Sequence, residues 1–183
     1  MIIRLSDCPP QPWKNGLGRT REIAVQPAAA GGDDFLWRVS LAEVDRAVPF
    51  SSFPGIDRQI VLLDGDGFTM TLDDGRTHAL TTPLVPFAFP GEAGVEVALA
   101  GGPTRDFNLM LRRGRVRGGI AVWRGTAAYV TAATAVLVYC TSGTIDCADG
   151  TLQPGDAWRP TPAATVELHA DAVALAVHVE AIA

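Results

Sequence analysis

A strict alternation of apolar and polar residues is the feature that most constrains how this chain can fold. Within segment 35–41, Arg38 and Ser40 fall on one side of an extended chain, and the other side carries only apolar residues: Phe35, Trp37, Val39 and Leu41. Successive side chains of a strand point to opposite faces of its sheet. The pattern therefore predicts a β-strand that covers a core.

Other β-rich runs occur along the whole chain, and Gly, Asp and Pro turns separate most of them. These runs are 20–25, 58–63, 68–72, 95–99, 106–111, 120–123, 135–140, 165–168 and 173–179. Glycine (19 residues) and proline (13 residues) are frequent in the 183-residue chain, which leaves little room for long helices. The only candidate helical turn is 40–46. The expected class is all-β, with the strand spacing of sandwiches or barrels.

The chain also contains a weak internal repeat. Segments 60–75 and 136–150 align at an offset of about 76 residues, and both read as strand, turn, strand and Asp-Gly turn. Segment 152–157 follows the second copy with a turn and a short strand typical of cupin-like barrels. The repeat predicts two stacked barrels joined at 112–119, with an N-terminal barrel over 1–117 and a smaller C-terminal barrel over 118–183, packed as one compact unit.

Composition excludes several classes of function. A net charge of −5 with 15 basic residues gives no basic surface of the kind that binds nucleic acid. No apolar run approaches the roughly 20 residues that span a bilayer, and no leader peptide is recognisable, so neither a membrane nor secretion is expected. The three cysteines (Cys8, Cys140 and Cys147) are odd in number and lack CxxC spacing. They suit a reducing compartment, and a cytoplasmic location is predicted.

Two residue types are scarce enough to be informative. Lys14 is the only lysine, whereas the other 14 basic residues are arginine, and Asn15 and Asn108 are the only asparagines. Lysine and arginine are not interchangeable at a tight site. Selection for the chemistry of these residues is one explanation, and chance retention is the other.

Three long motifs surround these residues. They are PWKNGLGRTREI at 12–23, VPFSSFPGIDR at 48–58 and GPTRDFNLMLRR at 102–113, with WRVS at 37–40 between the first two. Together they closely resemble the HutD/Ves family from about residue 12 to residue 113. Leu17, Val48 and Glu92 depart from the family pattern, and they leave the choice between the HutD and Ves branches open.

The resemblance implies a bicupin, in which two cupin-like units have the RmlC-like jelly-roll topology. It also implies an association with histidine-utilisation operons and a regulatory role that limits pathway output. No catalytic activity is implied.

The polar groups of the motifs are consistent with an anion site. Gly16 and Gly18 would allow a ligand to approach the backbone beside the lysine. Asp106, Asn108, Met110 and Arg112 share one strand face. The predicted ligand-binding residues are Lys14, Asn15, Arg38, Ser40, Arg58 and Asn108, and the predicted ligand is a small carboxylate metabolite such as urocanate or an acylated glutamate.

Each of these residues also has a structural interpretation. Asp57 and Arg58 could hold the turn before them, and Arg38 could face solvent. The two asparagines could satisfy backbone groups in turns. Trp13, Phe50 and Phe53 could simply pack in the core or at its rim.

The histidines do not match a cupin metal site, which needs two closely spaced histidines, a carboxylate and a later histidine. His78, His169 and His178 contain no HxH or HxxH pair. No cysteine lies in an activating motif, and no GxSxG sequence occurs. No metal, other cofactor or catalytic residue is therefore predicted, although His78 could serve an acid–base site of the sugar-epimerase kind.

The leading hypothesis is a non-catalytic protein that binds a small carboxylate and regulates histidine utilisation. The alternatives are a metal-independent cupin enzyme and an interaction scaffold built on an exposed patch of Trp13, Phe50 and Phe53. The sequence leaves open whether the chain forms a homodimer.

Overall fold

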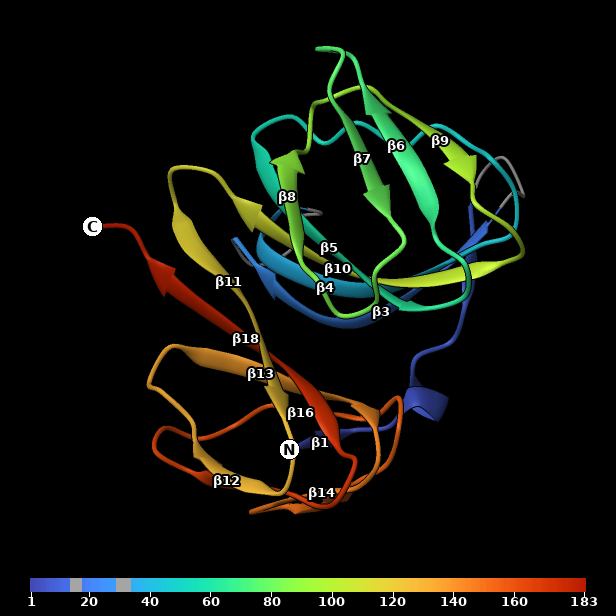
Figure 1. Cartoon of the computed structure of the whole chain (residues 1–183). Coiled ribbons are helices and arrows are strands. Elements are labelled where there is room, and N and C mark those ends of the chain that lie inside the picture. Colours follow the sequence, from blue (N-terminus) through green and yellow to red (C-terminus); the bar gives the residue numbers. More distant parts are fainter. Residues whose placement is uncertain (14–17, 29–33) are drawn as a thin grey trace. The chain divides into compact units, whose positions relative to one another are not determined.

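The computed structural model of the chain describes residues 1–13, 18–28 and 34–183, and Figure 1 shows that these residues are organised almost entirely as strands. Within them the only helical element is the 3₁₀ turn η1 (Leu5–Asp7). The predicted turn at 40–46 does not form, because β4 (Phe35–Val44) continues through it. No helix in the described part of the chain is long and apolar enough to cross a lipid bilayer.

The chain forms two compact units. We call Pro10–Val116 the motif unit, and Met1–Pro9 together with Arg117–Ala183 the terminal unit. The division predicted from the sequence, 1–117 and 118–183, differs at its start, because the first nine residues belong with the C-terminal part.

The motif unit contains two antiparallel sheets (Figure 1). The order in the large sheet is β2 (Gln11–Pro12), β3 (Gly18–Pro27), β4, β10 (Thr104–Arg112), β5 (Ile56–Asp64) and β8 (Phe87–Pro90). The order in the small sheet is β7 (Thr77–Leu80), β6 (Phe68–Leu72) and β9 (Val95–Leu99).

The terminal unit also has two sheets. The first has the order β1 (Ile2–Ile3), β16 (Ala157–Trp158), β13 (Ala135–Ser142), β18 (Val173–Ala181) and β11 (Val116–Arg124). The second has the order β12 (Ala127–Val130), β17 (Thr165–Leu168), β14 (Ile145–Cys147) and β15 (Gly150–Leu152).

The two units repeat one topology. The order β8-β5-β10-β4 corresponds to β16-β13-β18-β11, and the order β7-β6-β9 corresponds to β15-β14-β17. The weak sequence repeat falls on β5 and β6 in one unit and on β13 and β14 in the other. The predicted all-β bicupin is therefore confirmed, with each unit an open jelly roll of two sheets rather than a closed barrel.

Glycines at matching places turn the chain from one sheet to the next. Gly67 and Gly143 have φ angles of 75° and 68°. A Cβ on Gly67 would lie 2.0 Å from the carbonyl oxygen of Leu80, and one on Gly143 would lie 2.6 Å from Cα of Ala172. Both positions need glycine for conformation and for space.

Each unit has its own apolar core, built by the alternation noted in the sequence. The motif unit buries residues of both its sheets, including Ile60, Leu62, Phe68, Met70, Leu80 and Val95. The terminal unit buries Val138, Ile145, Leu152, Trp158, Val166 and Leu168.

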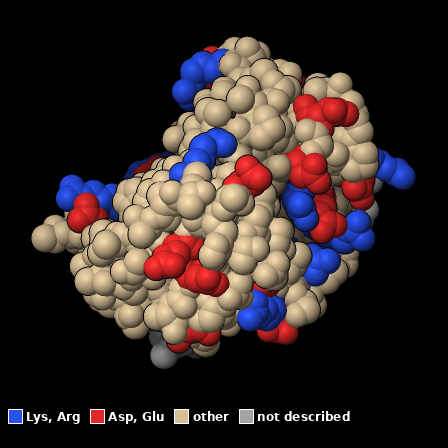
Figure 2. Space-filling model, turned by 60° about the horizontal axis from the view of Figure 1, so that its bottom comes forward, with Lys and Arg blue, Asp and Glu red and all other residues tan. Residues whose placement is uncertain are grey.

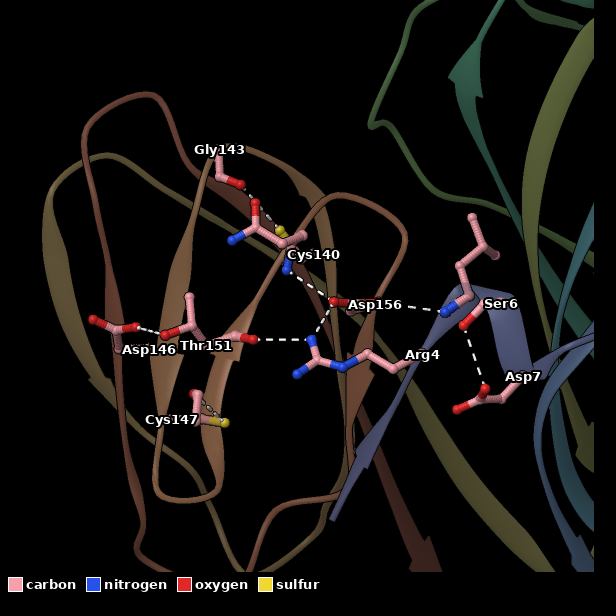
Figure 3. A network of polar contacts seen from close by, with 12 residues as sticks. Arg4, Ser6, Asp7, Cys140, Gly143, Asp146, Cys147, Thr151 and Asp156 are labelled. Atoms are coloured by element: carbon pink, nitrogen blue, oxygen red, sulfur yellow. Dashed lines mark hydrogen bonds and ion pairs between the residues drawn. The ribbon is translucent and has the colours of Figure 1, made fainter.

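A buried carboxylate holds the N-terminal segment in the terminal unit (Figure 3). Asp156 accepts hydrogen bonds from the Arg4 guanidinium at 2.6 Å and from the backbone N–H groups of Leu5 and Gln153 at 3.3 and 3.0 Å. Arg4 also donates to the carbonyl oxygen of Thr151 at 3.0 Å. This network, together with the pairing of β1 and β16, explains why the first nine residues belong to this unit.

Replacing Asp156 tests this attachment. We expect Asp156→Ala to lower the free energy of unfolding by about 2–4 kcal/mol, because three donors lose a charged acceptor. Urea denaturation followed by tryptophan fluorescence measures the loss. Asp7→Ala is the matched control, since the Asp7 side chain is exposed and accepts a hydrogen bond only from the neighbouring Ser6 hydroxyl among the bonds described. Equal losses in the two variants would show that the Asp156 network does not hold the segment.

Candidate ligand-binding site

The motif unit contains a cavity of about 490 Å³. Its size is within the range of 300–1,000 Å³ that is usual for small-molecule sites. The wall consists of strands β2, β3, β4, β5 and β10 together with the loop at 49–53. Polar and aromatic side chains from segments distant in the sequence therefore meet in one hollow.

Strand register explains how these side chains meet. Met110 on β10 pairs with Arg38 on β4 and with Arg58 on β5, and Asn108 pairs with Ser40. Residues two apart in a strand share a face, so these side chains form rows on one surface of the large sheet. Four of the predicted site residues, Arg38, Ser40, Arg58 and Asn108, line the cavity. The other two, Lys14 and Asn15, lie outside the described residues.

Arg58 is the central charge of this site. The residue is only 6% exposed, and its guanidinium lies 4.8, 5.2 and 5.6 Å from the ring centres of Phe89, Phe50 and Phe53. Burial lowers its pKa to about 10, against the opposing effect of the nearby Asp106. Arg58 thus remains a cation at neutral pH, held among aromatic faces that attract a cation.

A hydrogen-bonded relay connects Arg58 to a buried acid. The Arg58 Nη2 group donates to Asn108 Oδ1 at 2.9 Å, and Asn108 Nδ2 donates to Asp106 Oδ1 at 2.5 Å. Asp106 is 0% exposed, and this burial raises its pKa to about 7 although Arg58 acts to lower it. Among the described residues, none donates a hydrogen bond to the second oxygen, Oδ2.

Arg38 is a second cation in the wall, and it has a partner. Its Nε atom lies 2.9 Å from Glu22 Oε2, in an ion pair that lacks the alignment of a hydrogen bond. The Arg38 side chain is 23% exposed. The interpretation of Arg38 as a residue facing bulk solvent is therefore wrong, since it lines the cavity beside an acidic partner.

Aromatic residues form the rim. Trp13 Nε1 donates to Thr20 Oγ1 at 2.7 Å. A Cβ on Gly18 would lie 2.8 Å from the Trp13 ring, so glycine at this position makes room for the indole. Trp13, Phe50 and Phe53 are each half-buried and line the cavity, which differs from the exposed patch that a scaffold would need.

Arg112 shares a strand face with Asn108 in the sequence pattern, but it does not line the cavity. Its guanidinium pairs with Asp34 and donates to the carbonyl oxygen of Phe35 at 3.3 Å. Arg58, one of the predicted ligand-binding residues, is the second arginine of the cavity wall. The structural role proposed for the pair 57–58 applies only to Asp57, which accepts a hydrogen bond from Arg113 at 2.8 Å.

Asp106 was noted in the sequence as a face residue but was not selected for the site. Its spacing of two from Asn108 was the available signal, because it places both side chains on one strand face. Residue types alone do not show that Asp106 is buried, and it is burial that raises the pKa of its carboxyl group.

The basic run at 112–119 makes ion pairs within the units. Arg113 bridges Asp57 and Glu92, with a distance of 2.5 Å to Glu92 Oε1. Arg117 contacts Glu180 Oε1 at 2.6 Å. These contacts agree with the interpretation of the run as a connector that pairs with carboxylates.

The histidines lie apart from the cavity wall. His78 on β7 stacks on Phe87 with ring centres 3.7 Å apart, and burial lowers its pKa. His169 Nε2 lies 2.7 Å from Asp146 Oδ2 in the terminal unit. In the part of the chain that the structure describes, no three His, Cys, Asp or Glu side chains gather in a way that could hold a metal ion.

The pH dependence of stability tests the state of Asp106. Its folded-state pKa lies above the ordinary value of 3.8, so its contribution to stability is complete below about pH 4 and is lost as the pH rises through about 7. We expect Asp106→Asn to stabilise the protein relative to wild type more at pH 8 than at pH 5, by on the order of 2 kcal/mol. Thermal denaturation at the two pH values measures the difference, with the exposed Asp57→Asn as control. An equal effect at both pH values would show that Asp106 titrates normally.

Comparisons with known proteins agree with this architecture. The sequence model of the HutD family matches residues 5–177. An uncharacterised 21.2 kDa protein in the hutC 3′ region of Pseudomonas putida is 38% identical over 145 residues, which cover 79% of this chain and 75% of that protein. Protein Ves of Escherichia fergusonii is 42% identical over 101 residues, which cover 55% of this chain and 51% of Ves.

Solved structures extend the likeness to the whole chain. HutD from Pseudomonas fluorescens SBW25 superimposes with a TM-score of 0.86 at 30% identity and covers 100% of this chain and 99% of that one. Pirin YhhW from Escherichia coli, solved in complex with nickel(II), shares only the fold, with a TM-score of 0.61 at 7% identity over 97% of both chains. The chain thus belongs to the HutD family, which is linked to the histidine-utilisation locus.

Proposed function

We propose that this protein binds a small carboxylate metabolite in the cavity of the motif unit and takes part, without catalysis, in the regulation of histidine utilisation. The observation that carries the proposal is the buried Arg58 guanidinium, which is fixed by three aromatic rings and by Asn108 at the cavity wall. A preorganised guanidinium matches the geometry of a carboxylate and loses little freedom on binding it.

The remaining wall suits a planar or extended carbon skeleton. Ser40 offers a hydroxyl group, and Pro49, Phe50 and Phe53 offer apolar surface near the guanidinium. Ligand sites commonly combine an apolar wall with a few placed polar groups. Urocanate, a flat unsaturated carboxylate, and an acylated glutamate such as formylglutamate both belong to this chemical class.

The regulatory part of the proposal is supported by the family. The relative in Pseudomonas putida is named for its place in the hutC 3′ region, beside a gene of the histidine-utilisation locus. A binding protein encoded beside the genes of this pathway would be expected to respond to one of the pathway's metabolites. The cavity volume of about 490 Å³ is large enough for a metabolite of this kind.

Charge distribution also favours a small ligand over nucleic acid. The net charge is −5, and Figure 2 shows acidic and basic side chains interspersed on the face that it presents. Binding to a phosphate backbone relies on a continuous basic surface.

One observation favours an enzyme as the second candidate. A buried carboxyl group with a pKa of about 7 has the property expected of a general acid or base at neutral pH, and Asp106 is such a group. A metal-independent cupin enzyme would use it on a substrate held by Arg58.

A thermal-shift experiment tests the binding proposal. We expect at least one of urocanate, formiminoglutamate, formylglutamate and histidine to raise the melting temperature, because a ligand at a hundredfold excess over its Kd stabilises by roughly 2.7 kcal/mol. Arg58→Met should weaken binding roughly 10- to 100-fold, since it removes a charged hydrogen-bond donor but keeps an apolar stem. Arg76→Met, at an exposed turn, is the control. No shift with any of the four compounds would refute the proposal.

Product analysis separates the two candidates. After incubation of the purified protein with each of the same four compounds, a binding protein returns every compound unchanged. Turnover that disappears in Asp106→Asn would instead establish the enzyme.

A further inference from the structure

The hydrogen bonds of the Arg58–Asn108–Asp106 relay indicate which carboxyl oxygen of Asp106 can carry a proton. A guanidinium can only donate, so the Asn108 oxygen must face Arg58 and the Asn108 amino group must face Asp106. Asp106 Oδ1 therefore accepts from that amino group. The remaining oxygen, Oδ2, is buried and has no hydrogen-bond donor among the described residues, so it is the place for an acid proton.

Three charged side chains among the described residues line the cavity: Arg58 from β5, Arg38 from β4 and Asp106 from β10. Glu22 on β3 is exposed and does not line the cavity, but it forms an ion pair with Arg38. Arg105, next to Asp106 in the chain, lies opposite Glu43 in the strand register of β10 and β4, and its guanidinium lies 3.8 Å from Asp64 Oδ2.

The other described lining groups carry no charge. Strand β2 contributes Gln11 and Pro12, and the loop at 49–53 contributes proline, phenylalanine and serine. The uncharged ring of Phe89 on β8 lies beside Arg58. With Glu22 counted as the partner of Arg38, the charges of these described residues sum to zero when Asp106 is ionised and to one positive charge when Asp106 is protonated.

A bound carboxylate changes this balance. It would place a second negative charge close to the Arg58–Asn108–Asp106 relay, and two carboxylates that share one buried site cannot both ionise freely. A carboxylate bound at Arg58 would lie in the cavity, whereas Asp106 is fully buried, so we expect Asp106 to become neutral.

We propose that the cavity takes up one carboxylate together with one proton, and that Asp106 receives this proton. The inference rests on the proposed function, because it requires a carboxylate at Arg58. The proton comes from the solvent, forms its bond with Asp106 Oδ2, and returns to the solvent when the ligand leaves.

The same sum of charges indicates which charge the ligand should carry. Among the described residues, Glu22 compensates Arg38, so protonation of Asp106 leaves one uncompensated positive charge, and a monoanion matches it. A dianion of similar size, such as an acylated glutamate, would bring one negative charge too many for the described residues. The charges of the described residues thus favour a monocarboxylate with urocanate chemistry.

Isothermal titration with urocanate tests the coupling. The imidazole group of this probe, with an ordinary pKa of about 6.5, is neutral between pH 7.5 and 8.5. One linked proton weakens binding by at most tenfold per pH unit, and we expect a loss of roughly five- to tenfold over this interval. At pH 7.5, titrations in HEPES and Tris, which differ in ionisation enthalpy, should show uptake of close to one proton.

The same titration with formylglutamate tests the preference for a monoanion. We expect it to bind at least tenfold more weakly than urocanate at pH 7.5. Equal or tighter binding of formylglutamate would overturn the charge argument.

Asp106→Asn assigns the proton. The variant keeps the shape of the side chain but cannot titrate, so its affinity for urocanate should be the same at pH 7.5 and 8.5, without proton uptake. Asp57→Asn is the control and should behave like wild type. Proton uptake that persists in Asp106→Asn would show that another group receives the proton.

A measurement on the wild-type protein covers the case in which the variant does not fold. The carboxyl carbon of Asp106, followed by NMR from pH 5 to pH 9, should titrate at a higher midpoint when urocanate is bound. An unchanged midpoint refutes the coupling but leaves the binding proposal standing. If none of urocanate, formiminoglutamate, formylglutamate and histidine binds at either pH, the proposed function fails, and this inference fails with it.

Discussion

The site of the motif unit depends on a guanidinium that is buried in the protein. An isolated charge is costly to remove from water, so it needs partners in its surroundings. Arg58 has them in the faces of three phenylalanines, the Asn108 carbonyl group and the buried acid beyond it. These partners fix the cation in position but leave room beside it, and a ligand carboxylate can use that room.

The two units show how one topology serves two purposes. In the terminal unit, the space between the sheets is filled by apolar side chains, with the fully buried Trp158 as the largest. In the motif unit, apolar packing around Ile60, Phe68 and Met70 occupies only part of the interior, and the neighbouring part of the large sheet carries polar residues around a cavity. The motif unit therefore has a polar cavity beside its core, and the interior of the terminal unit is an apolar core.

Much of the fold was predictable because it follows from local rules. The alternation at 35–41 predicted β4, and the weak repeat predicted two units of equal topology. The site was partly predictable for the same reason, since the period of two places Arg38 with Ser40 on one face. Contacts between distant segments were not predictable. Asp156 holds the N-terminal segment in the terminal unit, and Glu22 on β3 forms an ion pair with Arg38 of the cavity wall.

The role of Asp106 shows the same limit most clearly. Its acidity depends on complete burial and on the orientation of Asn108, and neither property can be read from residue types alone. Once the geometry is known, the electrostatics follow from Coulomb interactions and desolvation. The summed charge of the described residues around the cavity therefore depends on whether Asp106 carries a proton.

The most direct test of the account is a crystal structure of the protein grown with urocanate. The account predicts that the ligand carboxylate lies within hydrogen-bonding distance of the Arg58 guanidinium, with its ring against the phenylalanine and proline wall. Urocanate bound elsewhere on the protein, or with its carboxylate turned away from Arg58, would contradict it.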